Sequence, residues 1–241
     1  MNVIITGANR GIGKALLDAF ASSGYNIWAC ARKSSTEFEL TISSIAKKYG
    51  VWIKPIYFDL SNQDDLEYGL LQIIRSKESI DVLINNAGVS NVGLLSQTKI
   101  EEIESLFAIN YFAMLRIIQK VSKRMTRQRK GIIINMGSTA GIDPQPGKIA
   151  YGSSKAAVIM MTKCLAKELG PLGIRVNCIA PGPVETEMIH QYSDEMLRQL
   201  ASESSLRRLG RAEEIASVAL YLASDQASYI NGEIIKVDGG R

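Results

Sequence analysis

The sequence predicts a doubly wound α/β fold, in which a parallel sheet of about seven strands is flanked by helices within a single domain of residues 1–241. Two observations support this prediction. Short runs rich in Val and Ile alternate along the chain with longer amphipathic stretches, and these short runs are continuously apolar. Strands buried on both faces have this composition, and repeated strand–helix order is typical of a parallel sheet. No linker and no change of composition marks a domain boundary.

The elements follow from these runs in chain order. The expected strands are Val3–Thr6, Ile27–Ala31, Trp52–Phe58, Val82–Asn85, Ile132–Met136, Arg175–Ile179 and Ile234–Val237. Amphipathic stretches between them predict helices, among them Lys14–Ser22, Asp64–Arg75, Ile103–Met125 and Lys155–Leu169.

The segment of residues 183–208 departs from this alternation. It follows a Pro-Gly-Pro turn and shows only a weak helical pattern. A long excursion after a strand is often a lid over a site, so we expect a lid-like segment here. An irregular surface excursion is the alternative.

Composition excludes disordered and low-complexity proteins. The chain is 46% hydrophobic and 22% charged, and 28 Lys and Arg against 24 Asp and Glu leave a net charge of only +4. It lacks the ~18 consecutive apolar residues of a membrane-spanning helix, and from its N-terminal residues we expect no signal peptide. Cys30, Cys164 and Cys178 lie in apolar stretches, which predicts buried free thiols and a cytoplasmic protein. With His190 as the one histidine, and no ligand spacing, we expect no metal.

The segment Thr6–Gly13 lies where the first strand turns into the first helix. Glycines at such a turn let the backbone approach a pyrophosphate, which the helix N-terminus stabilises. The strand–turn–helix context therefore predicts a Rossmann-type dinucleotide site. The residues expected to contact the cofactor here are Gly7, Asn9, Arg10, Gly11, Ile12 and Gly13.

The second strand bears on which dinucleotide is bound. NAD-binding folds usually carry an acid about 20 residues beyond the glycines, but no acid follows this strand before Glu37. Arg10 and Arg32 are placed to hold a 2′-phosphate, for which guanidinium groups are suited. We therefore predict NADP(H), with two unrelated surface arginines as the alternative. Asp59 and Leu60 end the third strand, where such folds hold the adenine.

Tyr151 and Lys155 are four residues apart and share one face of a helix. A free Tyr titrates near ~10, and a Lys ammonium together with a positive nicotinamide ring would lower that pKa. Tyr151 would then exchange a proton with a carbonyl oxygen. Ser138 ends the fifth strand, so a parallel sheet brings its hydroxyl to the same edge, where it would hydrogen-bond the substrate oxygen.

These motifs together resemble the short-chain dehydrogenase/reductase family. The resemblance rests on Gly-x-x-x-Gly-x-Gly at 7–13, Asn-Asn-Ala-Gly at 85–88, Tyr-x-x-x-Lys at 151–155, Pro-Gly-Pro-Val-Glu-Thr at 181–186, Leu-Gly-Arg at 209–211 and Val-Asp-Gly-Gly at 237–240. It covers essentially the whole chain and implies hydride transfer between NADPH and a carbonyl, in either direction.

The resemblance also implies roles that spacing alone does not give. Asn110 would kink its helix and hold a water linked to Lys155. The turn Asn86, Ala87 and Gly88 would pass under the cofactor, and Pro181, Gly182, Val184 and Thr186 would lie over the nicotinamide carboxamide. The family commonly forms tetramers through the helices 103–125 and 155–169 and the last strand, so we expect a homotetramer.

Within the family, the chain is most similar to 3-oxoacyl-[acyl-carrier-protein] reductases, which implies a 3-oxoacyl thioester on acyl carrier protein as substrate. A basic cluster before the Ser138 strand would dock an acidic carrier protein; it comprises Lys123, Arg124, Arg127, Arg129 and Lys130. Arg129 matches a docking position of that subfamily, but Leu172 stands where a second basic residue is expected. Basic residues also favour helix C-termini without any partner.

Other functions stay open at this stage. A sugar, a steroid-like compound or a small alcohol is an alternative substrate on the same scaffold. A non-catalytic dinucleotide sensor would need the glycine loop but not Ser138, Tyr151 and Lys155. Nucleic-acid binding is disfavoured by the low net charge and by the lack of aromatic residues within the basic cluster.

Overall fold

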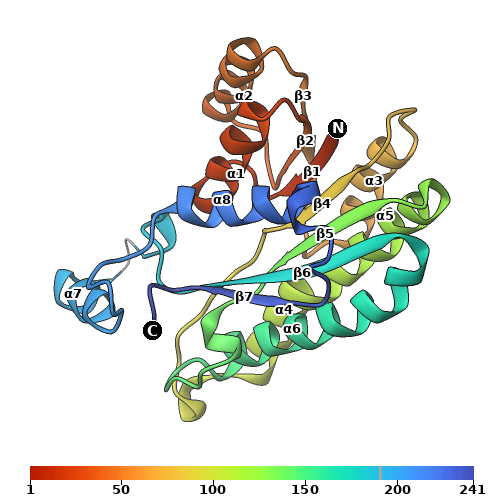
Figure 1. The fold of residues 1–241 in the computed structure, drawn as a ribbon. Coiled ribbons are helices and arrows are strands. Elements are labelled where there is room, and N and C mark those ends of the chain that lie inside the picture. The colour runs from red at the N-terminus through yellow and green to blue at the C-terminus, as the bar shows by residue number, and fades with distance from the viewer. Residues whose placement is uncertain (190–191) are drawn as a thin grey trace.

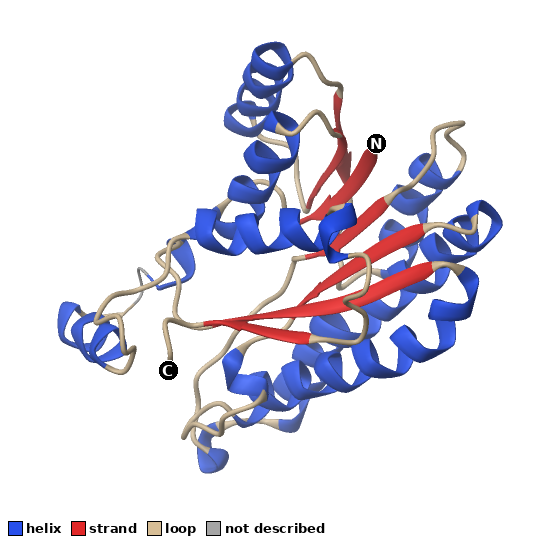
Figure 2. Ribbon diagram, in the orientation of Figure 1, coloured by secondary structure: helices blue, strands red, loops and turns tan. Residues whose placement is uncertain are grey.

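The computed structural model describes residues 1–189 and 192–241, and its seven strands form one sheet in the order β3-β2-β1-β4-β5-β6-β7 (Figure 1, Figure 2). Every neighbouring pair of strands is parallel. The strands are β1 (Asn2–Thr6), β2 (Asn26–Ala31), β3 (Ile53–Tyr57), β4 (Val82–Asn85), β5 (Gly131–Met136), β6 (Ile174–Pro181) and β7 (Ile234–Val237). The predicted doubly wound parallel sheet is confirmed.

Helices cover both faces of the sheet (Figure 2). One face packs against α1 (Gly11–Ser22), α2 (Thr36–Tyr49) and α8 (Ala212–Ala223). The other packs against α3 (Gln63–Ile74), α5 (Met114–Gln128) and α6 (Ile149–Leu169), with α4 (Ile100–Phe107) beside α6. Successive side chains of a strand point to opposite faces: Val3 and Ile5 enter the first core and Ile4 the second.

The strand order reverses beside β1, since β2 and β3 lie on one side of it and β4 to β7 on the other. In open α/β sheets, ligands bind outside the carboxyl ends of the strands at such a switch point. The segments that follow β1, β4 and β5 begin at Gly7, Asn86 and Gly137. The topology therefore brings the glycine loop, the Asn-Ala-Gly turn and Ser138 to one edge.

The predicted helix Ile103–Met125 is not continuous. A π-helical turn of residues Ala108–Ala113 separates α4 from α5, and Asn110 lies within it, fully buried. π-turns are a recognised cause of kinks and are frequent at functional sites. A kink at Asn110 is what the family resemblance implies.

Residues 183–208 contain a helix, α7 (Asp194–Ser202), preceded by a 3₁₀ turn at Glu187–Ile189. In Figure 1, α7 stands out beyond the carboxyl edge of the sheet, away from the other helices. None of its residues is buried. His190 falls outside the residues that the structure describes. Among the described residues, no helix has the length and apolar character needed to cross a membrane.

One expectation about the thiols is wrong. Cys30 and Cys178 are buried, but Cys164 is exposed. It lies on α6 beside Met160, where that helix turns an apolar stripe outward and lines a groove along α5. Ile118 and Val158, by contrast, are core residues of the single chain.

Candidate active site

The glycine loop after β1 is shaped by close backbone approaches. Gly7 and Gly11 have φ angles of 66° and 50°, a region that favours glycine. At Gly13, a Cβ would lie 1.8 Å from the carbonyl oxygen of Gly7. The turn can therefore be this tight only because these glycines carry no side chain, and the N–H groups at the start of α1 point to where a ligand would bind.

Thr6 joins this loop to the turn after β4. Its hydroxyl oxygen accepts hydrogen bonds from the backbone N–H groups of Asn86 and Ala87, both at 3.0 Å. The Asn86 amide donates in return to the carbonyls of Thr6 (2.9 Å) and Gly7 (3.2 Å). Thr6 was given no role from the sequence. A hydroxyl residue immediately before the first glycine is the feature that could have indicated one.

Ser138 and Tyr151 meet at the carboxyl edge of the sheet. Ser138 lies just beyond β5 and accepts a hydrogen bond from the N–H of Ala140 (3.2 Å), while Tyr151 lies in the first turn of α6. Burial raises the pKa of the Tyr151 phenol, a hydrogen bond with Ser138 lowers it, and the neighbouring Tyr192 raises it further. In the chain by itself the net direction is therefore upward, and any lowering by a bound cofactor would have to overcome this burial.

Lys155 lies one turn further along α6, with its Nζ 5.8 Å from the centre of the Tyr151 ring. Its ammonium donates a hydrogen bond to the carbonyl of Met136 (2.8 Å), and only 3% of the residue is exposed. Burial lowers the pKa of Lys155 to about 8. The amine is thus still mostly protonated at pH 7, but it loses its proton at a lower pH than a surface lysine does.

The Asn110 side chain fastens the π-turn to the segment after β4. Its amide oxygen accepts from the N–H of Val89 and its amide nitrogen donates to the Val89 carbonyl, both at 2.9 Å. The same nitrogen donates to the hydroxyl of Ser154 (3.1 Å). A Cβ on Gly88 would lie 3.1 Å from the Asn110 oxygen and 3.5 Å from Lys155 Nζ. Asn110, Lys155 and Gly88 therefore converge.

The predicted carboxamide turn closes on the glycine loop from the opposite side. The N–H of Gly182 donates to the carbonyl of Val237 (3.0 Å), and Val184 forms a β-bridge with Gly210. A Cβ on Gly11 would lie 3.2 Å from the methyl group of Thr186. Thr186 thus packs beside the first turn of α1, and its place over the nicotinamide carboxamide stays a prediction.

The adenosine end is more open. Arg10 and Arg32 are exposed, and Leu60 packs half-buried on the core. The Asp59 carboxylate accepts hydrogen bonds from the N–H and hydroxyl of Ser61, which lower its pKa, and the charges of Arg32 and Lys33 lower it further. Arg32 therefore lies within electrostatic range of the predicted adenine site.

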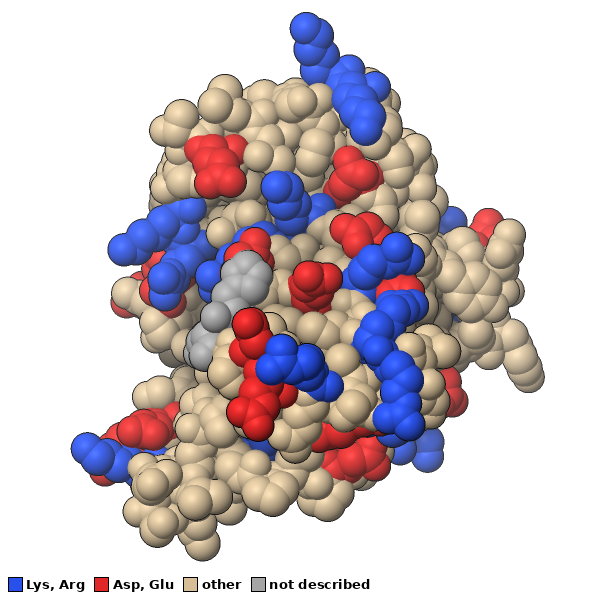
Figure 3. Space-filling view, turned by 90° about the vertical axis from the view of Figure 1, so that its left-hand side faces the viewer, with Lys and Arg blue, Asp and Glu red and all other residues tan. Residues whose placement is uncertain are grey.

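Figure 3 shows the face at the carboxyl ends of the strands, where Lys and Arg side chains are interspersed with Asp and Glu. Because neither sign dominates, long-range attraction of an anion is weak here. Recognition of phosphate groups rests instead on individual residues.

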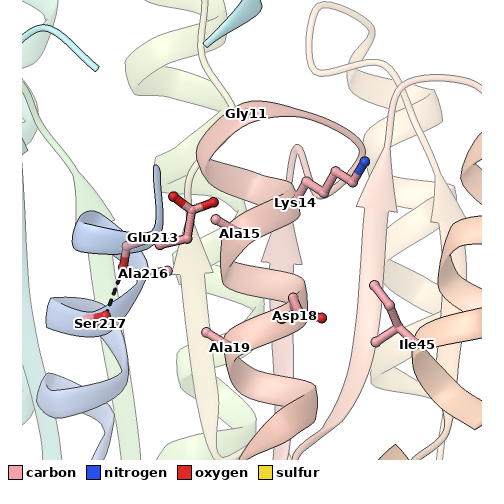
Figure 4. A pocket seen from close by; sticks show the side chains of 9 residues that line it. All are labelled: Gly11, Lys14, Ala15, Asp18, Ala19, Ile45, Glu213, Ala216 and Ser217. Carbon is pink, nitrogen blue, oxygen red and sulfur yellow. Dashed lines mark hydrogen bonds between the residues drawn. The ribbon is translucent and has the colours of Figure 1, made fainter. Parts of the chain in front are cut away.

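A separate hollow of about 330 Å³ lies between α1, α2 and α8 (Figure 4). Its floor is made of small residues, including Ala15, Ala19 and Ala216, where α1 and α8 pack closely. Of the predicted site residues only Gly11 lines it. The hollow is therefore distinct from the edge of the sheet at which Ser138 and Tyr151 lie.

Comparison with known proteins agrees with this geometry. The family model described as "Enoyl-(Acyl carrier protein) reductase" matches residues 7–241. A solved structure described as a short chain dehydrogenase/reductase family protein superposes with a TM-score of 0.88 at 29% identity, covering 100% of this chain and 96% of the other. The chain belongs to the short-chain dehydrogenase/reductase family.

Curated relatives narrow the resemblance within the short-chain dehydrogenase/reductases. The 3-oxoacyl-[acyl-carrier-protein] reductase FabG of Staphylococcus aureus (strain Mu50) is 36% identical over 239 residues, covering 99% of this chain and 97% of the relative. The protein of the same name from Thermotoga maritima is 37% identical over 237 residues, covering 98% and 96%.

Membership of this family makes the chain an oxidoreductase that uses a nicotinamide dinucleotide. The structure fits that cofactor. The glycine loop packs so closely that a Cβ at Gly13 would collide with the Gly7 backbone, and Thr186 lies beside Gly11; we call this arrangement the cofactor cradle. These residues would hold the pyrophosphate at the start of α1.

Proposed function

We propose that this short-chain dehydrogenase/reductase reduces the 3-oxo group of an acyl thioester on acyl carrier protein, with NADPH as reductant. The observation that supports this best is the convergence of Ser138, Tyr151 and Lys155 beside the glycine cradle at the switch point of the sheet. The names of the full-length relatives support the 3-oxoacyl thioester.

Each polar side chain has a distinct proposed task. When bound, the dinucleotide supplies the hydride. Tyr151 gives its phenolic proton to the carbonyl oxygen, and Ser138 hydrogen-bonds the same oxygen as negative charge develops on it. Lys155 favours the phenolate that remains, and Asn110 holds the helix and the Val89 segment in place around Lys155.

The preference for NADPH is proposed from Arg10 and Arg32. Both are exposed at the adenosine end, and no acid between β2 and Glu37 would bind the ribose diol of NAD. An arginine pairs with a 2′-phosphate through charge-assisted hydrogen bonds.

The residues of the basic cluster differ in what they contact. Arg124 is half-buried, and its guanidinium donates hydrogen bonds to the carbonyls of Ile74 (3.2 Å), Ser76 (3.5 Å) and Glu78 (3.2 Å). It therefore caps the end of α3. Docking of an acidic carrier protein, as we propose it, rests on the remaining exposed residues; they are Lys123, Arg127, Arg129 and Lys130.

This cluster lies before β5, whereas Ser138 lies after it. A strand of that length spans about 20 Å, so the cluster and the site occupy opposite edges of the sheet. A carrier protein bound there fits delivery to the site of a neighbouring subunit better than to the same chain. We accordingly propose a homotetramer that uses the apolar groove between α5 and α6, lined by Leu115, Met160 and Leu165. We further propose that the protein works in the cytoplasm, with residues 183–208 as a lid.

The proposed function is tested by following nicotinamide absorbance with an acetoacetyl thioester, with NADPH and NADH offered in parallel. We expect rapid loss of NADPH and a rate with NADH at least about tenfold lower, since a charged pair contributes on that scale. Arg32→Ala should narrow this ratio. Turnover with NADH alone would overturn the assignment of Arg10 and Arg32. No turnover with either cofactor, in protein that binds NADPH, would overturn the proposal that a 3-oxoacyl thioester is the substrate.

A further inference from the structure

The Val-Asp-Gly-Gly motif of residues 237–240 begins at the last residue of β7 and has no part in the proposed hydride and proton transfer. Its two glycines have positive φ angles, 68° at Gly239 and 78° at Gly240, which favour glycine. The Asp238 carboxylate accepts a hydrogen bond from the N–H of Gly240 (3.0 Å) and lies 3.1 Å from Lys236 Nζ. The motif therefore forms a fixed turn just beyond the carboxyl end of β7.

Carbonyl groups of this turn hold the end of the segment of residues 183–208. The Gly239 carbonyl accepts a hydrogen bond from the Ser204 hydroxyl (3.0 Å). The Gly240 carbonyl accepts one from the Ser205 hydroxyl (2.8 Å). Ser204 is buried, and a Cβ on Gly239 would collide with its hydroxyl oxygen. The turn thus holds the residues that follow α7, and in Figure 1 the C-terminus lies beyond the end of β7 on the side of α7.

The same turn also contacts the beginning of that segment. The N–H of Gly182 donates to the carbonyl of Val237 (3.0 Å), and a Cβ on Gly182 would lie 2.8 Å from the Cβ of Asp238. Gly182 belongs to the turn that is predicted to lie over the nicotinamide carboxamide. Both ends of the segment therefore rest on residues 237–240.

Two ion pairs flank the Val-Asp-Gly-Gly turn. Arg241 pairs with Glu203 at the end of α7, and only 18% of the Arg241 side chain is exposed. Lys236 pairs with Asp143 (3.1 Å), which lies between β5 and α6 in the loop of the proposed catalytic serine. Since α7 has no buried residue, packing of that helix contributes little to its position. The position of α7 relative to the catalytic loop therefore depends on the contacts at its base.

We propose that residues 236–241 are a brace that positions the segment of residues 183–208 at the carboxyl edge of the sheet. Gly239 and Arg241 are positioning residues, because they act through that segment and not on the reacting atoms. The inference rests on the proposed function in one respect, since its effect on catalysis is measured with a 3-oxoacyl thioester. When the brace is loosened, the segment opens more often, so substrate dissociates sooner while proton transfer from Tyr151 is unchanged.

Gly239→Ala tests the brace, with Gly50→Ala as the matched control. The two glycines have φ angles of 68° and 70°, but an added methyl group meets Ser204 at Gly239 and open space at Gly50. The full chain with bound NADPH is treated with trypsin, and cleavage after Arg198, an exposed residue of α7, is followed by mass spectrometry. We expect Gly239→Ala to be cut at least about fivefold faster than Gly50→Ala, because proteolysis follows the population of open conformations.

Arg241→Gln and Glu203→Gln are milder variants that keep the turn intact. Each removes one partner of the ion pair, so each should raise the rate of cleavage after Arg198 and KM for an acetoacetyl thioester about twofold to fivefold, with kcat changed less than about twofold. The double variant should behave like either single variant, because the same ion pair is lost. Glu67→Gln, which breaks an ion pair with Lys120 between α3 and α5, should change neither quantity.

Two results would overturn the inference. Equal cleavage rates in Gly239→Ala and Gly50→Ala would show that the turn does not hold the segment. Additive effects of Arg241→Gln and Glu203→Gln, or a fall in kcat with KM unchanged, would show that this pair does not act through the position of the segment. Cleavage requires no substrate, so it decides the inference even if wild-type protein reduces no thioester, a result that would refute the proposed function alone.

Discussion

The cofactor cradle after β1 requires glycines that carry no Cβ atom, whereas the start of α6 requires buried polar side chains. A Cβ at Gly13 would lie 1.8 Å from the Gly7 carbonyl oxygen. Asn110 and Lys155, by contrast, are 0% and 3% exposed, and each is held by hydrogen bonds. The cradle should therefore fail when a methyl group is added. The start of α6 should lose activity when one polar atom is removed. Of the two regions, it is also the one that contains a group, Lys155, whose charge changes near neutral pH.

The largest effect is expected from the loss of one oxygen atom on the catalytic side. Tyr151→Phe keeps the ring but removes the proposed proton donor, and general acid catalysis usually contributes about 10²–10⁴ in rate. We expect kcat to fall by at least about 100-fold, with NADPH affinity, measured by fluorescence titration, nearly unchanged. Tyr229→Phe, at a fully exposed tyrosine, is the control. Turnover within about tenfold of wild type would remove Tyr151 from the proposed mechanism.

Addition of one carbon atom should break the cradle. In Gly13→Ala the new methyl meets the backbone of Gly7, which must shift and drag the loop with it. We expect NADPH to bind at least about tenfold more weakly and the melting temperature to fall by several degrees, as overpacking costs about 1–3 kcal/mol. Gly24→Ala separates the two effects. Gly24 has open space around it but a positive φ, so the variant should lose stability while binding NADPH normally.

Lys155 should reduce the free energy of unfolding although turnover requires it. Its folded-state pKa of about 8 lies below the ordinary 10.5, so at pH 7 a charge is held where burial disfavours it. That shift corresponds to about 3 kcal/mol. Lys155→Met should therefore lower turnover, by less than Tyr151→Phe does, yet raise the free energy of unfolding at pH 7 by about 1–3 kcal/mol, since the bond to the Met136 carbonyl is also lost.

The stability gained in Lys155→Met should depend on pH, because Lys155 has different pKa values in the folded and unfolded chain. Between pH 8 and 10.5 the unfolded chain binds more protons at Lys155 than the folded one, so wild-type stability rises across this window. The advantage of Lys155→Met should be constant below pH 8 and fade above it, as measured by urea unfolding at several pH values. The exposed Lys163→Met should show no such gain. A Lys155→Met variant less stable than wild type at pH 7 would mean that the buried charge is not costly.

The sequence predicted the sheet well because its strands are buried on both faces and therefore continuously apolar. Val82–Asn85 and Ile234–Val237 were matched at both ends. The break at Ala108–Ala113 could not come from periodicity, because the amphipathic pattern runs through it. It is stabilised by Asn110 binding Val89, a contact between segments 21 residues apart.

Sequence reasoning was weakest where a buried and an exposed apolar helix face have the same pattern of residues. Cys164 lies in an apolar stretch of α6, but the groove beside α5 leaves it exposed, and periodicity does not distinguish an outward apolar stripe from a core one. The capping role of Arg124 and the contact between Lys148 and Tyr192 depend on the path of distant loops. The motif residues themselves converged because each follows a strand or starts a helix at one edge of the sheet.

The smallest effect is expected from Ser154, which ties the two buried elements of the catalytic side together. Its hydroxyl donates to the Tyr151 carbonyl (2.8 Å) and accepts from the Asn110 amide (3.1 Å). Ser154→Ala leaves that amide with its bond to Val89, so the free energy of unfolding should fall by only about 1 kcal/mol and the melting temperature by about 2–4 °C. Ser153→Ala, at the exposed neighbour, should change neither. Because Asn110 is then held at one end only, kcat should fall several-fold while NADPH affinity stays constant, so that a lost polar atom weakens the catalytic side without affecting the cradle.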